Sequence, residues 1–570
     1  MRSYPFKRQE TVDLIDIEQY PTIGDAFFEA ATRYADHVLL AVPANANRTY
    51  AQQGLELTYS EVAESVRQLM DIYSQNGFGT GHRVALSLEN QPAHVLHKLA
   101  LNALGVCCVP VNPDYRAQEL AYLIDHAKVD LLLALPQHAC LIDEALTHTQ
   151  WRPTVLCIDD FESQLTAPRQ QSSSQKPDGL TPASILYTSG TTGHPKGCVL
   201  SHRYELASGA WYATLGGLVD IRPRQERLYN PLPLFHVNAS ILSFYCMMLT
   251  GNCQIQTDRF QPIRWWQEVR ESKATIVHYL GIIIPLLLAQ PAQSRDREHS
   301  VRFGFGAGVE PQLHAVFEER FGFPLLEIWG MTEMVRTLVD CIPPRKVGTR
   351  AFGRARPGLD VKVVDGDDNE VPDGTPGEMV IRHSAKTPRQ DFFTGYLDDE
   401  IATKQAWRNG WFHTGDVVFR DPDGMLHFFD RDKHIIRRAG ENISAVQVEA
   451  VLQTHPWVQT VAVLPVSDEI REQEVLACIV LSDAMRNTSD YSTSEQRQEK
   501  AHALFEHCYE ALAYYKAPGW ILFMPSLPTT GTQKIQKHRI FSAQEDPRER
   551  SEIVDCRALK KRQAKRQATH

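Results

Sequence analysis

The stretch LYTSGTTGHPKG, from Leu186 to Gly197, is the part of the sequence around which the rest of the chain is organised. The apolar residues 185–187 lead into it and indicate a buried strand. Its three glycines permit positive φ and a close approach to a ligand, and successive N–H groups in such a loop form a nest for an anion. The hydroxyl side chains add donors, and Lys196 adds a positive charge. With a strand before it and a helix-compatible run from Tyr204 after it, the stretch predicts a polyphosphate-binding loop rather than a flexible linker.

The loop is not of the Walker A type, because Pro195 precedes Lys196 and Gly197 follows it where Gly-Lys-Ser/Thr would be needed. The stretch instead resembles the signature loop of the adenylate-forming (ANL) superfamily, which includes acyl-CoA synthetases, nonribosomal peptide adenylation domains and luciferases. The resemblance implies that ATP is bound here by Thr188, Ser189, Gly190, Thr191, Thr192, Gly193 and Lys196.

Length and periodicity set the expected architecture. A chain of 570 residues needs more than one core. Strands alternate with helices through its first part, which predicts parallel, doubly wound sheets, and short strands with frequent turns follow from about Gly353. A second αβ alternation begins near residue 433. The fold class is therefore α/β: a large N-terminal domain of doubly wound sheets plus a small β-barrel region, and a small mobile α+β C-terminal domain. The expected units are residues 1–432, 433–545 and a basic, unstructured tail, 546–570.

Composition narrows the class of protein. The net charge of −10 argues against nucleic acid as a partner. The eleven cysteines show no CxxC pair or zinc spacing, which favours free thiols in a reducing compartment. No apolar signal region opens the chain, and the longest apolar run, residues 279–289, is too short to span a bilayer. A cytoplasmic protein without a transmembrane segment is expected.

Three further motifs resemble those of the superfamily in the same order. Residues 229–236 end in His236, which the resemblance places with the catalytic set as a wall or gate of the acyl pocket rather than as a general base. In residues 304–311, Gly306 and Ala307 match the loop that packs along adenine. In residues 327–333, Trp329 can stack on a purine, Thr332 can donate to the α-phosphate, and Glu333 is a hard oxygen ligand suited to Mg²⁺. From this motif, the resemblance implies that the nucleotide is bound by Ile328, Trp329, Gly330 and Thr332.

The remaining motifs lie toward the C-terminus. Asp416 matches the aspartate that accepts both ribose hydroxyls, a task suited to a carboxylate because it only accepts. Arg431 would bind ribose or α-phosphate, and Lys433 occupies the hinge position. The thiol tunnel is expected beside Gly440, Glu441 and Asn442. Lys534, in a motif that begins at Pro528, matches the catalytic lysine that bridges carboxylate and α-phosphate, although Gln533 stands where many members have a small residue.

The resemblance covers roughly residues 20–545 and implies an AMP-forming acid–thiol ligase that uses ATP, Mg²⁺ and coenzyme A. Free CoA is the expected thiol donor, because no carrier-protein site follows the small domain. Two alternatives stay open: an adenylation enzyme that serves a separate carrier, and a non-catalytic nucleotide-binding homologue. The local sequence of residues 208–212 and 317–322 looks similar to that of bacterial crotonobetaine/carnitine-CoA ligases. Carnitine-type acids are therefore favoured over short or medium fatty acids, although Trp211 and Tyr212 are expected to be core aromatics rather than a quaternary-ammonium site. A homodimer is left open.

Overall fold

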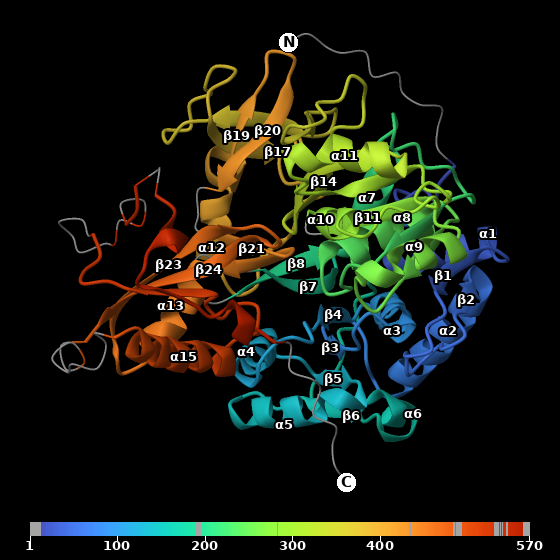
Figure 1. The fold of residues 1–570 in the computed structure, drawn as a ribbon. Coiled ribbons are helices and arrows are strands. Elements are labelled where there is room, and N and C mark those ends of the chain that lie inside the picture. Colours follow the sequence, from blue (N-terminus) through green and yellow to red (C-terminus); the bar gives the residue numbers. More distant parts are fainter. Residues whose placement is uncertain are drawn as a thin grey trace.

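The computed structural model describes residues 13–188, 195–281, 283–431, 435–482, 485, 493–528, 535, 537, 540–542 and 545–561. We call residues 13–431 the large lobe and residues 435–561 the small lobe. Figure 1 shows the small lobe lying against one side of the large lobe, beside β7 and β8. The expected boundary at residues 432/433 falls between these described ranges. None of the described helices is long and apolar enough to cross a membrane.

Two mixed sheets form the body of the large lobe. The first has the strand order β18-β8-β7-β4-β3-β5-β6, and β7, β4, β3, β5 and β6 run parallel. Its strands are β3 (Arg83–Ser87), β4 (Cys107–Pro110), β5 (Leu131–Ala134), β6 (Thr154–Cys157), β7 (Pro182–Thr188), β8 (Lys196–Ser201) and β18 (Gly395–Tyr396). The second has the order β14-β13-β12-β11-β9-β10-β1-β2 and is parallel from β13 to β1. Its strands are β1 (Val38–Val42), β2 (Leu55–Thr58), β9 (Arg227–Asn230), β10 (Cys253–Gln256), β11 (Ile276–Leu280), β12 (Phe303–Ala307), β13 (Leu325–Met331) and β14 (Met334–Val339).

Helices connect and cover these sheets. They are α1 (Ile23–Arg33), α2 (Tyr59–Gln75), α3 (Pro92–Ala103), α4 (Ala117–Ala127), α5 (Ala139–Thr147), α6 (Phe161–Gln164), α7 (His202–Ala213), α8 (Phe244–Leu249), α9 (Pro262–Glu271), α10 (Ile283–Leu288), α11 (Pro311–Phe321) and α12 (Glu400–Ala406). Thr58 caps the N-terminus of α2 and forms a capping box with Glu61. The doubly wound arrangement is confirmed.

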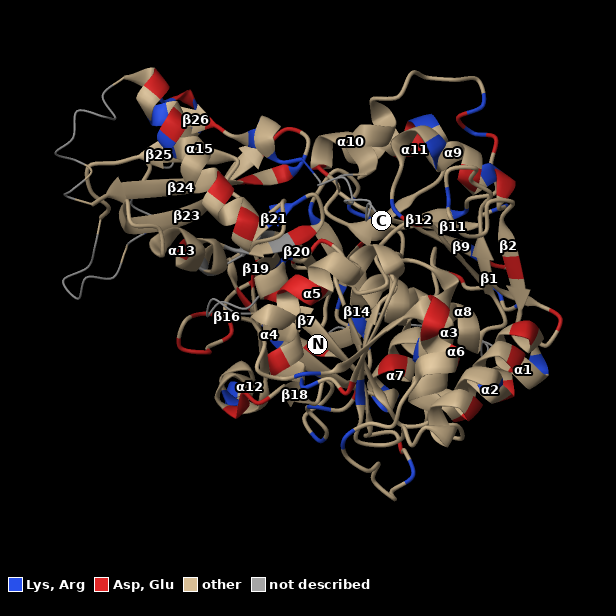
Figure 2. Cartoon of the chain, turned by 90° about the horizontal axis from the view of Figure 1, so that it is seen from below, with Lys and Arg blue, Asp and Glu red and all other residues tan. Residues whose placement is uncertain are grey.

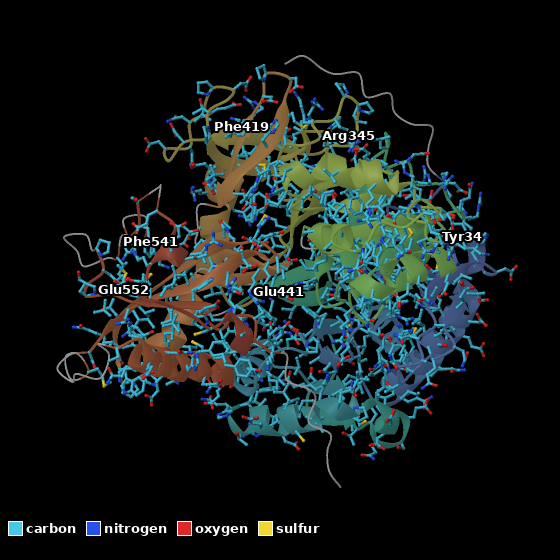
Figure 3. All side chains as sticks on the ribbon, in the orientation of Figure 1. Tyr34, Arg345, Phe419, Glu441, Phe541 and Glu552 are labelled. Atoms are coloured by element: carbon cyan, nitrogen blue, oxygen red, sulfur yellow. The ribbon has the colours of Figure 1, made fainter. Side chains whose placement is uncertain are left out.

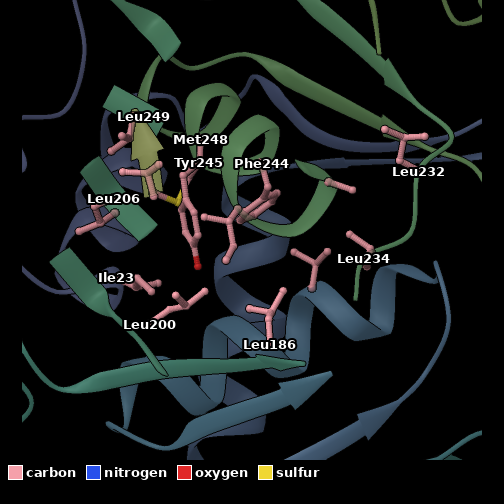
Figure 4. Close-up of a cluster of buried hydrophobic side chains, with 14 of the residues drawn as sticks. Ile23, Leu186, Leu200, Leu206, Leu232, Leu234, Phe244, Tyr245, Met248 and Leu249 are labelled. Carbon is pink, nitrogen blue, oxygen red and sulfur yellow. The ribbon is translucent and has the colours of Figure 1, made fainter. Parts of the chain in front are cut away.

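The two strands that flank the phosphate loop, β7 and β8, are anchored in the core between the sheets. Figure 4 shows Leu186 of β7 and Leu200 of β8 facing Tyr245 of α8, with Leu206 of α7 nearby. All four side chains are buried. Burial of apolar surface at this point fixes the strands from which the phosphate loop emerges.

The expected β-region is a five-stranded antiparallel sheet of order β15-β20-β19-β17-β16. Its strands are β15 (Ala351–Arg354), β16 (Asp360–Val364), β17 (Gly377–Arg382), β19 (Phe412–Arg420) and β20 (Met425–Arg431). The small lobe has its own six-stranded sheet and its own core. It contains β21 (Ile435–Arg438), β22 (Glu441–Ser444), α13 (Ala445–Gln453), β23 (Val458–Asp468), β24 (Glu472–Leu481), α15 (Ser494–Ala511), β25 (Trp520–Phe523) and β26 (Ile553–Asp555).

The expectation of an unstructured tail from residue 546 is wrong for residues 546–561. β26 pairs antiparallel with β25, and Lys560 forms a buried ion pair with Glu474. A basic stretch at a chain end is usually solvated, but here its charge is neutralised inside the small lobe. The expected tail residues 562–570 lie outside the described part of the chain. Acidic and basic positions are interspersed over the elements of both lobes (Figure 2).

Candidate active site

The phosphate loop connects two antiparallel strands. β7 ends at Thr188 and β8 begins at Lys196, and these two residues are paired in the ladder. A strand therefore follows the loop before α7 begins at His202, whereas the sequence indicated only a helix-compatible run. The ammonium Nζ of Lys196 lies 4.7 Å from the ring centroid of Tyr396. The loop residues Ser189, Gly190, Thr191, Thr192 and Gly193 lie outside the described residues.

The proposed metal carboxylate sits in a hairpin turn. β13 and β14 pair antiparallel, with Thr332 and Glu333 at the turn, so neither residue caps a helix. Glu333 is buried, and its Oε1 accepts a hydrogen bond of 2.8 Å from the hydroxyl of Tyr396. The backbone oxygen of Thr332 accepts a bond from Tyr204 Oη. The turn thus holds an oriented carboxylate against Tyr396, whose ring also lies beside Lys196 at the start of β8.

The expected adenine wall is formed by β12 and the residues that follow it. A Cβ on Gly306 would lie 2.2 Å from the backbone oxygen of Tyr279, so this position accepts only glycine. The N–H of Gly308 donates to Glu327 Oε2 at 3.0 Å, and Tyr279 Oη donates to Glu327 Oε1 at 2.8 Å. Burial raises the pKa of Glu327 to about 7, against the lowering effect of these bonds. A carboxyl group that changes protonation near neutral pH lines this wall.

Trp329 and Asp416 are joined directly. The indole Nε1 of Trp329 donates to Asp416 Oδ2 at 2.8 Å, and both side chains are buried. Asp416 is also paired with Arg431 across β19 and β20. The indole therefore fixes the carboxylate that is expected to hold the ribose, a link that the separate motifs did not predict.

A cavity of about 480 Å³ brings these segments together with the small lobe. The large lobe contributes Ala307, Gly308, Glu327, Ile328, Trp329 and Gly330, and the small lobe contributes Arg437, Glu472 and Arg548 among others. Ile328 and Gly330 therefore line the same cavity as Ala307. Segments from β12, β13 and β24 converge here although they are far apart in the sequence.

The expected CoA residues of the small lobe contact the large lobe. Figure 3 labels Glu441 at the junction of the two lobes. Its Oε2 lies 3.8 Å from His236 Nε2. Burial alone would raise the pKa of Glu441, but hydrogen bonding and the charge of His236, together with Lys516, lower it below the usual value. Gly440 has φ of +86°, and a Cβ there would lie 2.3 Å from Leu280 Cδ1. The Gly440–Glu441 turn is therefore packed against β11 and the His236 segment.

A second contact between the lobes surrounds the start of α4. Lys516 forms a buried ion pair with Glu119, and Arg116 Nε donates to the backbone oxygen of Leu512 at 3.0 Å. Asn112 Nδ2 donates to Tyr515 Oη at 3.1 Å. Charged and polar groups of the two lobes thus satisfy each other in this arrangement.

Several predicted site residues or their side chains lie outside the described part of the chain. Lys433 and Lys534 lie outside the described residues, as do the side chains of Arg431 and Asn442. Within the described part of the chain, no cluster of three or more His, Cys, Asp or Glu side chains could hold a metal ion alone. Glu333, the residue expected to bind Mg²⁺, is therefore not part of such a cluster among the described residues.

Family models match both lobes. The model of the AMP-binding enzymes matches residues 27–397, more than half of the 570-residue chain. The chain belongs to the AMP-binding enzyme family. The model of the AMP-binding enzyme C-terminal domain matches residues 447–534 of this AMP-binding enzyme. The adenylate-forming resemblance on which the site was built is confirmed.

Curated relatives place this AMP-binding enzyme among the acyl-CoA ligases. It is 28% identical over 512 residues to a crotonobetaine/carnitine–CoA ligase of Salmonella paratyphi B, covering 85% of this chain and 93% of the relative. It is 29% identical over 507 residues to the enzyme of that name from Salmonella typhi, with the same coverage. The protein is thus an AMP-forming ligase of the adenylate-forming acyl-CoA ligase family, whose members bind ATP or AMP.

Solved structures share the fold. o-Succinylbenzoate CoA synthetase from Bacillus subtilis, as a double mutant bound with the product analogue OSB-NCoA, superposes with a TM-score of 0.76 at 20% identity, covering 90% of this chain and 97% of that one. The same synthetase in complex with AMP gives 0.62 at 21% identity, covering 91% and 98%. The amide bond synthetase McbA from Marinactinospora thermotolerans gives 0.73 at 25% identity, covering 89% and 98%.

Sequence reasoning missed Tyr396, Glu472 and the Glu119–Lys516 pair, because none stands in a motif that it used. It expected the two aromatics of α7 to be core residues, and this is confirmed for Tyr212, which is buried and stacked on Phe305. Trp211 is half-buried against the core and donates its indole N–H to the backbone oxygen of Thr337 at 2.9 Å.

Proposed function

We propose that the protein activates a carboxylic acid with ATP to form an acyl-adenylate and pyrophosphate, and then transfers the acyl group to coenzyme A with release of AMP. The observation that carries the proposal is the shared cavity of Ala307, Gly308, Trp329 and Gly330, with Asp416 fixed by the Trp329 indole. This arrangement supplies backbone and an aromatic edge for a purine and an oriented carboxylate for a ribose.

The first half-reaction joins two anions. A substrate carboxylate is already ionised at neutral pH, so no general base is required. Positioning and charge neutralisation remain, and we assign them to Lys196, the hydroxyls of the phosphate loop and Lys534. Thr332 would donate to the α-phosphate, and Arg431 would bind ribose or phosphate. The carboxylate oxygen forms a bond to the α-phosphorus while the bond from that phosphorus to the pyrophosphate oxygen breaks, so pyrophosphate leaves with the electron pair.

The carboxylate of Glu333 fits Mg²⁺. It is buried in the β13–β14 hairpin turn, and the hydrogen bond that its Oε1 accepts from Tyr396 orients the carboxylate for a hard cation. When bound, the ion neutralises charge on the substrate phosphates.

We propose that the described lobe arrangement serves the second half-reaction. The Gly440–Glu441 turn, assigned to the thiol tunnel with Asn442, is packed against Leu280 and faces His236. The higher TM-score with the synthetase bound to a CoA product analogue than with the same enzyme bound to AMP supports this assignment. Rotation about Lys433, the assigned hinge between residues 1–432 and 433–545, would then bring Lys534 to the phosphate loop for the first half.

The acid is proposed by analogy alone. The names of the curated relatives favour crotonobetaine- or carnitine-like acids, with short to medium fatty acids as the alternative. An adenylation enzyme that passes its product to a separate carrier protein would release pyrophosphate without forming a CoA ester.

A screen of carboxylic acids for pyrophosphate release, with and without CoA, tests the proposal. Lys534→Ala should abolish adenylate formation and retain thioester formation from synthetic acyl-AMP, because the lysine is withdrawn in the second half. Lys404→Ala, at an exposed lysine of α12, is the control and should behave as wild type. Undiminished adenylation in Lys534→Ala, or no pyrophosphate release with any acid, would refute the proposal.

A further inference from the structure

Tyr396 contacts two site residues through different parts of its side chain. It belongs to the short strand β18, which pairs antiparallel with β8 so that Tyr396 lies beside Cys198. Its hydroxyl donates to Glu333 Oε1 at 2.8 Å, and its ring face lies 4.7 Å from Lys196 Nζ. The proposed metal carboxylate and the loop ammonium are thus held by one rigid group.

The two contacts have distinct physical origins. A neutral hydroxyl that donates to a carboxylate restricts the rotamer of that carboxylate and orients its second oxygen. The ring face attracts the ammonium through its quadrupole and leaves the N–H donors of the lysine available for phosphate. A phenol can meet both demands at once, whereas phenylalanine meets only the second and leucine meets neither.

The surroundings of Tyr396 restrict its movement. Its ring packs edge-on against Phe393 at 4.9 Å, and the N–H of Phe393 donates to the backbone oxygen of Glu333 at 3.0 Å. The buried thiol of Cys198 hydrogen-bonds the Glu333 carboxylate as well.

We propose that Tyr396 is a positioning residue for the adenylation half-reaction: it fixes the Glu333 carboxylate for Mg²⁺ and the Lys196 ammonium for the ATP phosphates. This role rests on the proposed function. The competing explanation is that the ring only fills space between β18 and β8. The two explanations differ for Tyr396→Phe, which keeps the volume of the ring and removes only the oxygen.

Calorimetric titration with ATP, in the presence of Mg²⁺ and in EDTA, separates the two contacts. For Tyr396→Phe we expect ATP binding in EDTA to match wild type, while the gain in affinity from Mg²⁺ falls roughly tenfold, as for a lost hydrogen bond to a charged group. The Mg²⁺ concentration for half-maximal pyrophosphate release should rise with it. Tyr396→Leu should also weaken ATP binding in EDTA, because Lys196 loses the ring.

The control is Tyr50→Phe, which removes a hydroxyl donated to Asp258 in another part of the large lobe and should leave both titrations unchanged. Thermal unfolding of each variant shows whether the fold is intact. Wild-type Mg²⁺ dependence in Tyr396→Phe, or equal weakening in both titrations, would overturn the role of Tyr396 alone. If wild type itself bound ATP neither with nor without Mg²⁺, the proposed function would fall together with it.

Discussion

The buried Glu119–Lys516 pair joins the lobes and gives a quantitative test of what their arrangement does. Glu119 lies in the first turn of α4 in the large lobe, and Lys516 follows α15 in the small lobe. Both side chains are nearly inaccessible, with exposures of 5% and 6%. Lys516 also lies 5.5 Å from the ring of Tyr115. The pair exists only while the lobes are in contact here.

Glu119→Gln should shift the lobe equilibrium away from this arrangement. Removing one partner leaves the other charge buried and uncompensated, which costs about 3–5 kcal/mol in buried pairs. The lysine can avoid this cost if the small lobe moves away and its ammonium reaches water. About 3 kcal/mol corresponds to roughly a hundredfold change in the equilibrium. The thioester-forming half-reaction should therefore slow by up to roughly that factor.

Two assays on the same protein measure the two half-reactions separately. The first follows pyrophosphate release with acid and ATP, and the second follows thioester formation from synthetic acyl-AMP and CoA. We expect only the second to slow in Glu119→Gln, and the double variant Glu119→Lys/Lys516→Glu to recover part of the loss. Glu298→Gln, which removes an exposed ion pair with Arg295, should leave both rates unchanged. If Glu119→Gln slowed adenylation as much as thioester formation, the arrangement would not be specific to the second half.

Two further predictions concern the cavity. Burial raises the pKa of Glu472 to about 7, with Glu310 and Glu327 adding to the shift and Arg437 and Arg350 opposing it. This pKa exceeds the value of about 4.3 in an unfolded chain, so the protonated carboxyl of Glu472 contributes to the stability of the fold. That contribution is complete below about pH 4.3 and is lost as the pH rises through about 7. The unfolding temperature of Glu472→Gln should therefore rise relative to wild type between pH 5 and pH 8, and a constant difference would contradict this account. Trp329→Phe should weaken AMP binding about tenfold in calorimetry, since Asp416 loses a donor from a charge-assisted bond; unchanged affinity would show that the indole does not position the carboxylate.

Local patterns predicted the alternation of strands and helices, because it depends on nearby residues. The doubly wound sheets of the large lobe and the short antiparallel strands after about Gly353 agree with that prediction. The glycine–hydroxyl loop and the segment from Glu327 to Glu333 likewise predicted nucleotide-binding residues, and these assignments stay predictions. β8 was missed because Lys196 and Gly197 were interpreted as the end of a ligand loop, and strand pairing with β7 was not visible in the sequence.

Contacts between distant segments left no comparable signal. Glu119 and Lys516 are separated by 397 residues, and each taken alone has the pattern of a solvated charge on a helix or loop. Trp329 and Asp416 each matched a motif, but only the packing of β13 against the β15–β20 side of the β-region brings the indole to the carboxylate. Such pairings depend on how sheets and lobes pack, which periodicity does not encode.

The segment after the matched family region shows how far this dependence extends. The C-terminal family model ends at residue 534, yet Lys560 pairs with Glu474, whose carboxylate also holds Arg438 at 2.8 Å. Arg438 is the last residue of β21, directly before the Gly440–Glu441 turn that meets Leu280 and His236. Burial lowers the pKa of Lys560 to about 7, against the opposing effect of Glu474. One buried carboxylate therefore links residues beyond the last recognised motif to the turn assigned to the thiol tunnel, so the position of that turn is set partly by residues that no motif includes.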